Sequence, residues 1–136
     1  MNNELMLTNN SDTYNKEIFT SCKMDNLEDK KKMFNALDNC DFLLNDKKGS
    51  EIILKDIYIE KITKPDDETG EINTKYRTIL FDVDGVSYAT GSYGIYNAIV
   101  RLTKFYGDPT WEDGIPVKIV ERKLEKGKTQ LTLEVI

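Results

Sequence analysis

From residue 51 onward, hydrophobic and polar residues alternate with the short period that is typical of β-strands, with one interruption. Within residues 51–64 the apolar positions change phase. Ile52 and Leu54 share one parity, whereas Ile57 and Ile59 share the other. A change of phase inside a single strand indicates a bulge or a bend, of the kind that curls a long strand around a corner. We therefore expect one long, bent strand at this point.

Four more strands and one helix are predicted after it. Ser92 is a suitable helix N-cap, and Ile95, Ile99, Leu102 and Phe105 follow it on one apolar stripe at helical spacing. The helix should end at Gly107. The strands are expected at residues 72–83, 86–90, 115–123 and 128–135.

The N-terminal part of the chain has a different character. Residues 1–15 are rich in Asn and Ser and show little periodicity, so we expect a flexible tail. Residues 16–50 predict an extension with a strand at 17–22 and a helix at 26–38. Asp25 is its expected N-cap, with Glu28 completing a capping box.

The segment Ile79-Leu80-Phe81-Asp82-Val83-Asp84-Gly85 fits two incompatible structures. It resembles the nucleophile strand of haloacid-dehalogenase-type phosphatases, a parallel strand followed by two aspartates. Asp84-Gly85 is equally typical of a tight hairpin turn, where these residues tolerate positive φ. The phosphatase would need more parallel strands after Asp82, and the rest of the chain predicts only one helix and one hairpin. We therefore favour the hairpin.

The predicted order from residue 51 is β-β-β-α-β-β. This is the order of an OB-fold, a five-stranded Greek-key barrel with a helix between its third and fourth strands. The fold class expected is mostly β with some α, in which residues 51–136 form the barrel and the N-terminal strand and helix lie against it. A chain of 136 residues suits a single domain.

Composition excludes several kinds of chemistry. The chain has no histidine and two isolated cysteines, so it offers neither a Cys/His zinc site nor a histidine base. Carboxylates could still form a site for a hard cation, but we expect no metal, no cofactor and no catalysis. It also lacks an apolar run near the ~20 residues that cross a bilayer. Its first residues resemble no secretory signal, so the expected location is the cytoplasm, without a membrane partner.

The net charge of −5 argues against a nucleic-acid ligand, but its distribution is uneven. Between Ile115 and Gln130 the bases outnumber the acids Glu121 and Glu125. A polyanion responds to this local potential more than to the total charge. The bases concerned are Lys118, Arg122, Lys123, Lys126 and Lys128.

Several short motifs, in this order and spacing, resemble one family. They are Phe34-Asn35-Ala36, the run from Asp67 to Glu71, Ile79-Leu80-Phe81, Asp84-Gly85 with Tyr88, and the closing strands at Val117 and Leu131. Together they are similar to the small single-stranded DNA-binding proteins of phages of Gram-positive bacteria. The resemblance implies a protein that coats displaced strands during DNA replication by tyrosine stacking, with replication proteins as further partners. Tyr88 matches a DNA-binding tyrosine of that family.

Binding of single strands without sequence preference requires aromatic rings for the bases and cations for the phosphates. Strands 2 and 3 of an OB-fold present such a face, so Tyr76 and Tyr88 are the stacking candidates, with Tyr58 behind them. The phosphate candidates are Lys75, Arg77, Lys118, Arg122, Lys123 and Lys128.

Each candidate residue also has a structural interpretation. A tyrosine at a barrel edge packs its ring and leaves its hydroxyl in water, and a surface lysine is often simply solvated. Tyr93, Tyr96 and Tyr106, on or beside the helix, are assigned to packing or surface, and Trp111 stays unassigned. The alternative function is a small acidic protein-interaction module, whose carboxylates would imitate DNA phosphates and inhibit a host factor.

Overall fold

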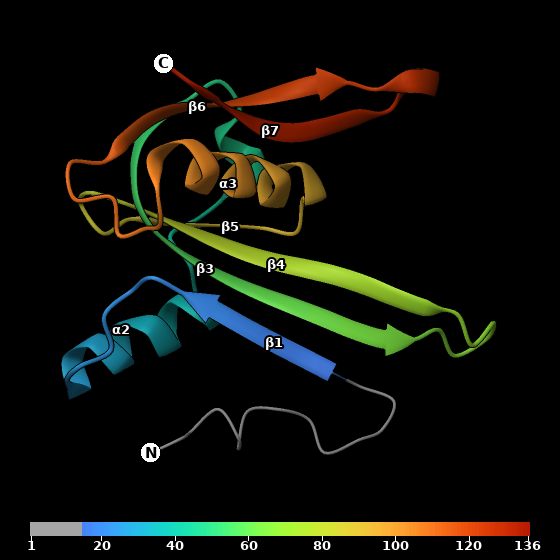
Figure 1. The fold of residues 1–136 in the computed structure, drawn as a ribbon, viewed down its shortest axis with the longest axis horizontal. Coiled ribbons are helices and arrows are strands. Elements are labelled where there is room, and N and C mark those ends of the chain that lie inside the picture. Colours follow the sequence, from blue (N-terminus) through green and yellow to red (C-terminus); the bar gives the residue numbers. More distant parts are fainter. Residues whose placement is uncertain (1–14) are drawn as a thin grey trace.

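Seven strands in one sheet and two helices make up residues 15–136, the part of the chain that this computed structural model describes (Figure 1). The helices are α2 (Leu27–Asp38) and α3 (Tyr93–Tyr106). The strands are β1 (Asn15–Thr20), β2 (Phe42–Leu43), β3 (Glu51–Pro65), β4 (Ile72–Asp82), β5 (Ser87–Thr90), β6 (Ile115–Lys123) and β7 (Thr129–Val135). Short 3₁₀ turns lie at Leu44–Lys47 and Glu125–Gly127.

Strand β3 organises the sheet, and its change of phase is a bulge as the sequence predicts. Its register against β4 shifts between Leu54 and Asp56. Before the bulge, one edge of β3 pairs with β6; beyond it, the same edge pairs with β1. The bulge therefore lets one strand serve two partners in turn and curls the sheet.

The strand order differs from the predicted five-stranded barrel. The elements after residue 51 follow one another as expected, but the sheet has seven strands in the order β2-β5-β4-β3-β6-β7, with β1 attached to β3. Strands β1 and β2 both come from the N-terminal extension, so the extension is built into the sheet and does not merely lie against it. Within residues 15–136, β5 and β7 do not pair. The sheet is thus a curled, OB-like half-barrel that stays open.

The N-terminal boundaries also differ from those predicted. Asn26, and not Asp25, caps α2, because its side chain accepts a hydrogen bond from the backbone NH of Asp29 at 2.8 Å. Phe42 and Leu43 form the two-residue strand β2, which the sequence pattern does not predict. Only Asn15 of the predicted tail lies within the described residues, where it begins β1.

Helix α3 fills the concave side of the sheet, between the β6–β7 hairpin and the layer of β3 and β4 (Figure 1). Ser92 caps it as predicted, and Ile95, Ile99 and Leu102 are buried in the main core. Phe105 was expected on the same stripe, but it is exposed. The helix ends close to this position, so the last turn projects beyond the core.

Helix α2 covers the opposite face of the same strands. Met33 and Ala36 pack there against a second core of Tyr58, Ile79 and Phe81. Successive residues of β4 therefore serve different helices, since neighbouring side chains of a strand point to opposite faces. Both faces of β4 are therefore covered at the centre of the strand.

The turn after β4 is a hairpin, which contradicts the phosphatase interpretation. Strand β4 is antiparallel to both of its neighbours, β3 and β5. The turn itself is wider than a two-residue turn: the NH of Gly85 donates to the carbonyl of Asp82 at 2.9 Å. Gly85 alone has positive φ, at 82°, while Asp84 does not. This geometry is typical of a turn followed by a glycine bulge.

Candidate nucleic-acid interface

Tyr88 lies inside the curled sheet and only 7% of it is exposed. Its ring stacks on Phe42 with the ring centroids 5.7 Å apart, and its hydroxyl donates to the Asp82 carboxylate at 3.1 Å. Burial, and then this carboxylate, raise the pKa of Tyr88 to about 12. Phe42 covers the ring, so stacking of a base on Tyr88 stays a prediction that requires Phe42 to move.

Tyr58 and Arg77 lie on the face of the sheet that α2 covers. Tyr58 is buried, and its hydroxyl donates to Glu60 at 2.6 Å. Burial, and then Glu60, raise the pKa of Tyr58. The Arg77 guanidinium donates to the carbonyl of Leu37 near the end of α2. Lys75 has the same parity as Arg77 and is exposed. These three candidates thus share a face with one another, but not with Tyr76.

The remaining basic candidates lie on the β6–β7 hairpin. Lys118 stands between Glu51 and Glu134 on the neighbouring strands. Arg122, Lys123 and Lys128 are exposed towards the tip. Since β6 alternates its side chains, Lys123 shares the face of Thr129 opposite it, and Arg122 points the other way. The structure therefore divides the predicted phosphate contacts among several surfaces.

Tyr76 lies in a cluster of three tyrosine rings, with Tyr93 and Tyr96 of α3. The rings of Tyr76 and Tyr96 stack at 3.9 Å between centroids, and the Tyr93 ring lies 5.6 Å from Tyr76 and 6.0 Å from Tyr96. Tyr93 is 54% exposed. Desolvation, followed by the adjacent Tyr96, raises the pKa of Tyr76. We call Tyr76, Tyr93 and Tyr96 the tyrosine cluster; it is a ready stacking platform for bases.

A groove of about 260 Å³ runs beside the tyrosine cluster, between β1 and α3. Tyr76 and Tyr96 line one part of it and Phe19 of β1 lines another. Lys61 also lines this groove and lies directly opposite Tyr76 in the β3–β4 register. Aromatic surface and a cation therefore occur side by side, as single-stranded nucleic acid requires.

Tyr93 does not line this groove, but its ring contacts Tyr76 and Tyr96, which do, and it lines a second hollow at the start of α3. That hollow, of about 480 Å³, is lined by Tyr93 together with Thr129 and Gln130 of β7. Lys123 faces the same side of the hairpin as Thr129. The tyrosine cluster thus stands between the β3–β4 layer and the basic hairpin. In Figure 1 both hairpins extend past α3 towards the same side of the molecule.

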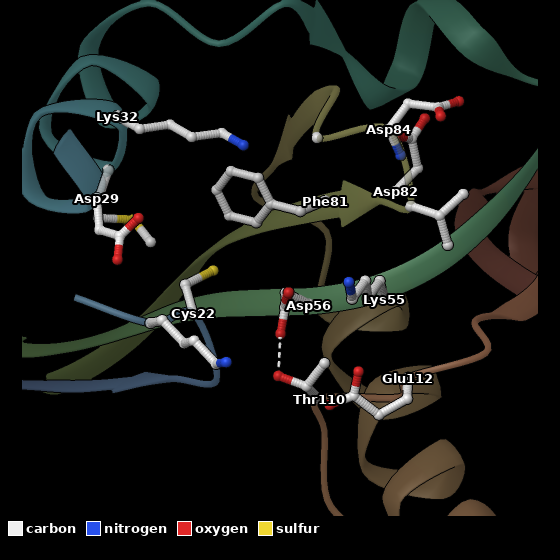
Figure 2. A pocket seen from close by; sticks show the side chains of 14 residues that line it. Cys22, Asp29, Lys32, Lys55, Asp56, Phe81, Asp82, Asp84, Thr110 and Glu112 are labelled. Carbon is white, nitrogen blue, oxygen red and sulfur yellow. Dashed lines mark hydrogen bonds between the residues drawn. The ribbon is translucent and has the colours of Figure 1, made fainter. Parts of the chain in front are cut away.

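A further pocket, of about 350 Å³, lies between α2 and the Asp82–Gly85 turn (Figure 2). Lys32 extends from α2 towards this turn, so closely that a Cβ on Gly85 would lie 2.7 Å from its Nζ. Five carboxylates and three lysines line the pocket, an electrostatic balance that disfavours a polyanion. The lining carboxylates are Asp29, Asp56, Asp82, Asp84 and Glu112.

Asp82 and Asp84, the pair that suggested phosphatase chemistry, belong to this pocket and to its turn. The Asp82 carboxylate accepts hydrogen bonds from the backbone NH groups of Asp84 and Val86, at 2.9 and 3.0 Å, as well as from Tyr88. It therefore fixes the hairpin turn. Among residues 15–136 no group of three or more Cys, Asp or Glu side chains is arranged to hold a metal ion. No helix of this part of the chain is long and apolar enough to span a bilayer.

Sequence reasoning left Tyr93, Tyr96 and Phe19 out of the candidate interface. Tyr93 and Tyr96 are three residues apart on α3, a spacing that places them on one helix face, and they directly follow the strand that carries Tyr88. That spacing was a usable signal. Phe19 gave none, because its position beside α3 depends on the pairing of β1 with β3.

The chain matches one family model. A family model described as Phage Single-stranded DNA-binding protein, of the phi29 type, matches residues 12–136. No curated protein matches the chain, and neither does any solved structure. The match covers every strand and both helices of the fold.

Proposed function

Because the chain belongs to the phage single-stranded DNA-binding protein family, we propose that it coats displaced single strands, without sequence preference, during the replication of phage or mobile-element DNA. It does so by stacking bases on tyrosine rings and by contacting phosphates with lysines. The observation that carries this proposal is the tyrosine cluster, whose three rings lie within 6.0 Å of one another with Tyr93 exposed.

Stacking on these rings explains tolerance of sequence. Every base has a π-face, so a ring platform accepts all four bases, and each stacked base contributes about 1–3 kcal/mol. Tyr93 is the first ring that a strand meets, since it is the most exposed of the three. Tyr76 and Tyr96 stack on each other behind it and hold the platform rigid.

Cations on both sides of the tyrosine cluster hold the phosphates. Lys61 flanks Tyr76 on the β3 side, while Lys123 and Lys128 belong to the basic hairpin beyond Tyr93. The strand accordingly runs from the β1–α3 groove, across Tyr93, to the hairpin. Along this path the groove is lined by Glu17 and Lys61, and the excess of positive charge lies at the hairpin tip, where Lys123 and Lys128 are exposed.

The protein acts by binding alone and carries out no catalysis. Its place of action is the cytoplasm of the host cell, where it meets the replication proteins that produce and consume single strands. Stacking on Tyr58 or Tyr88, and phosphate contacts from Lys75, Arg77, Lys118 and Arg122, remain predictions that would extend the interface beyond this path.

Titration of the protein with oligo-dT, followed by intrinsic tyrosine fluorescence, tests this function. We expect saturable quenching that weakens as salt is raised, because bound phosphates release counterions. The absence of any change at low salt would contradict the function. The acidic net charge would then favour the protein-interaction module instead. Such a module would show no quenching of tyrosine fluorescence by oligo-dT.

A further inference from the structure

The groove between β1 and α3 has the form of a small aromatic slot. Its floor is made of Ile57, Ile59 and Ile99, which are all buried in the main core. Tyr76 and Tyr96 stand on one wall, and Phe19 stands on the strand that borders the other side. An apolar floor between aromatic walls suits a flat, weakly hydrated ring more than a charged group.

Phe19 is unusual in this setting. It lies on β1 opposite Ile59, so its side chain is on the inner face of the sheet, yet 51% of it is exposed. A large aromatic side chain on an inner face is normally covered by its own core. Here the groove leaves it open to solvent, beside rings that belong to the tyrosine cluster.

We propose that this groove takes one base of the bound strand, inserted between Phe19 and the Tyr76–Tyr96 pair; this subsite rests on the proposed function. The groove volume of about 260 Å³ lies just below the ~300–1,000 Å³ of drug-sized ligand sites. It therefore holds a single ring system and not a dinucleotide. The N-terminal extension thus contributes to DNA binding, because β1 supplies one wall.

The surroundings of the groove fit a nucleotide as well as a base. Lys61 lies at the groove between Tyr76 on β4 and Glu17 on β1, opposite both in register. Lys61 is the lysine that lines this groove, and it is therefore the cation for the phosphate of an inserted nucleotide. The Glu17 carboxylate repels the phosphates of the bound DNA and keeps them from running along β1. The DNA therefore leaves the groove towards Tyr93.

Variants at Phe19 test this subsite by oligo-dT titration of the full chain at low salt. Phe19→Ala and Phe19→Leu should each weaken binding by about 5- to 100-fold, because both remove the ring that stacks on the base. Phe34→Ala is the matched control: Phe34 is a 69% exposed phenylalanine on α2, away from the groove, and its loss should leave the affinity unchanged.

The outcomes separate the subsite from the proposed function. Wild-type affinity in Phe19→Ala would overturn the subsite while leaving single-strand binding intact. Wild-type affinity in Phe19→Leu would also overturn it, even if Phe19→Ala binds more weakly, because Leu keeps apolar packing but has no ring. Failure of the wild-type protein to bind oligo-dT would overturn the function itself. If Phe19→Ala does not fold, Phe19→Trp decides. Because Trp111 also emits, its quenching by oligo-dT is compared with that of the wild type: greater quenching in Phe19→Trp supports the subsite, and equal quenching during saturable binding overturns it.

Discussion

Tyr76 and Tyr88 lie on adjacent strands and on the same face of the sheet, yet they have opposite environments. Tyr88 is buried, stacked on Phe42 and hydrogen-bonded to Asp82. Tyr76 stands at a groove, next to the exposed ring of Tyr93. The face of a strand therefore does not decide whether a tyrosine is available to a ligand. What decides is which later element covers that part of the face.

Substitution of Tyr88 should have the largest effect on stability. Tyr88→Ala removes a buried ring and its stacking on Phe42, so we expect a loss of about 3–5 kcal/mol in the free energy of unfolding. Tyr93→Ala, at an exposed ring, should change it by about 0.5 kcal/mol or less. Urea unfolding of both variants measures the contrast. Equal losses would remove the distinction between a structural and a binding tyrosine.

The ionisation of Tyr88 should appear as a loss of stability at high pH. Its folded pKa of about 12 lies above the ordinary value of 10.0, so the folded state holds the proton more tightly than the unfolded state. This contribution to stability is complete below pH 10 and is lost as the pH rises from 10 towards 12.

Unfolding measured across this pH range should therefore show a shallower decline in Tyr88→Phe than in the wild-type protein. Some decline should remain, because the pKa of Tyr58 is raised too. Tyr106→Phe, at an exposed position, is the control and should follow the wild type. An identical pH dependence in Tyr88→Phe would show that the Tyr88 hydroxyl is not in the environment described.

The salt dependence of binding should distinguish the two faces of the β3–β4 layer. Lys61 faces the groove with Tyr76, whereas Lys75 lies on the opposite face. Lys61→Ala should lower the slope of log K against log salt by about 0.7–1, the value of one phosphate contact. Lys75→Ala should leave the slope unchanged where the strand keeps to the tyrosine cluster; a slope lowered in both variants would extend the interface to the opposite face, as the predicted Lys75 contact requires. The reverse result would move the DNA path to the face that α2 partly covers.

Much of the fold could be predicted because its signals are local. The phase change of β3, the Ser92 cap of α3 and the alternation of β4 each depend on residues close together in the sequence. The attachment of β1 and β2 to the sheet could not be predicted in this way. Strand β2 has two residues and pairs with β5 across a long stretch of chain, and β1 joins β3 similarly. Such pairings leave no periodic pattern.

The sequence indicated which kinds of residue form the candidate site, tyrosines and lysines, but not which of them lie together on the surface. Alternation gave no sign that Phe42 would cover Tyr88 or that α2 would cover Tyr58. Helical spacing placed Tyr93 and Tyr96 together, and only the packing of α3 against β4 brought them to Tyr76. These are tertiary contacts, and they decide which rings face solvent.

Titration of Tyr93→Ala and Tyr106→Ala with oligo-dT, beside the wild-type protein, tests the central claim most directly. The two tyrosines begin and end α3 and are 54% and 53% exposed, so they match in residue type, helix and accessibility. If the tyrosine cluster is the stacking platform, Tyr93→Ala should bind about 5- to 100-fold more weakly, and Tyr106→Ala should bind like the wild type. Equal affinity of the two variants would contradict the claim.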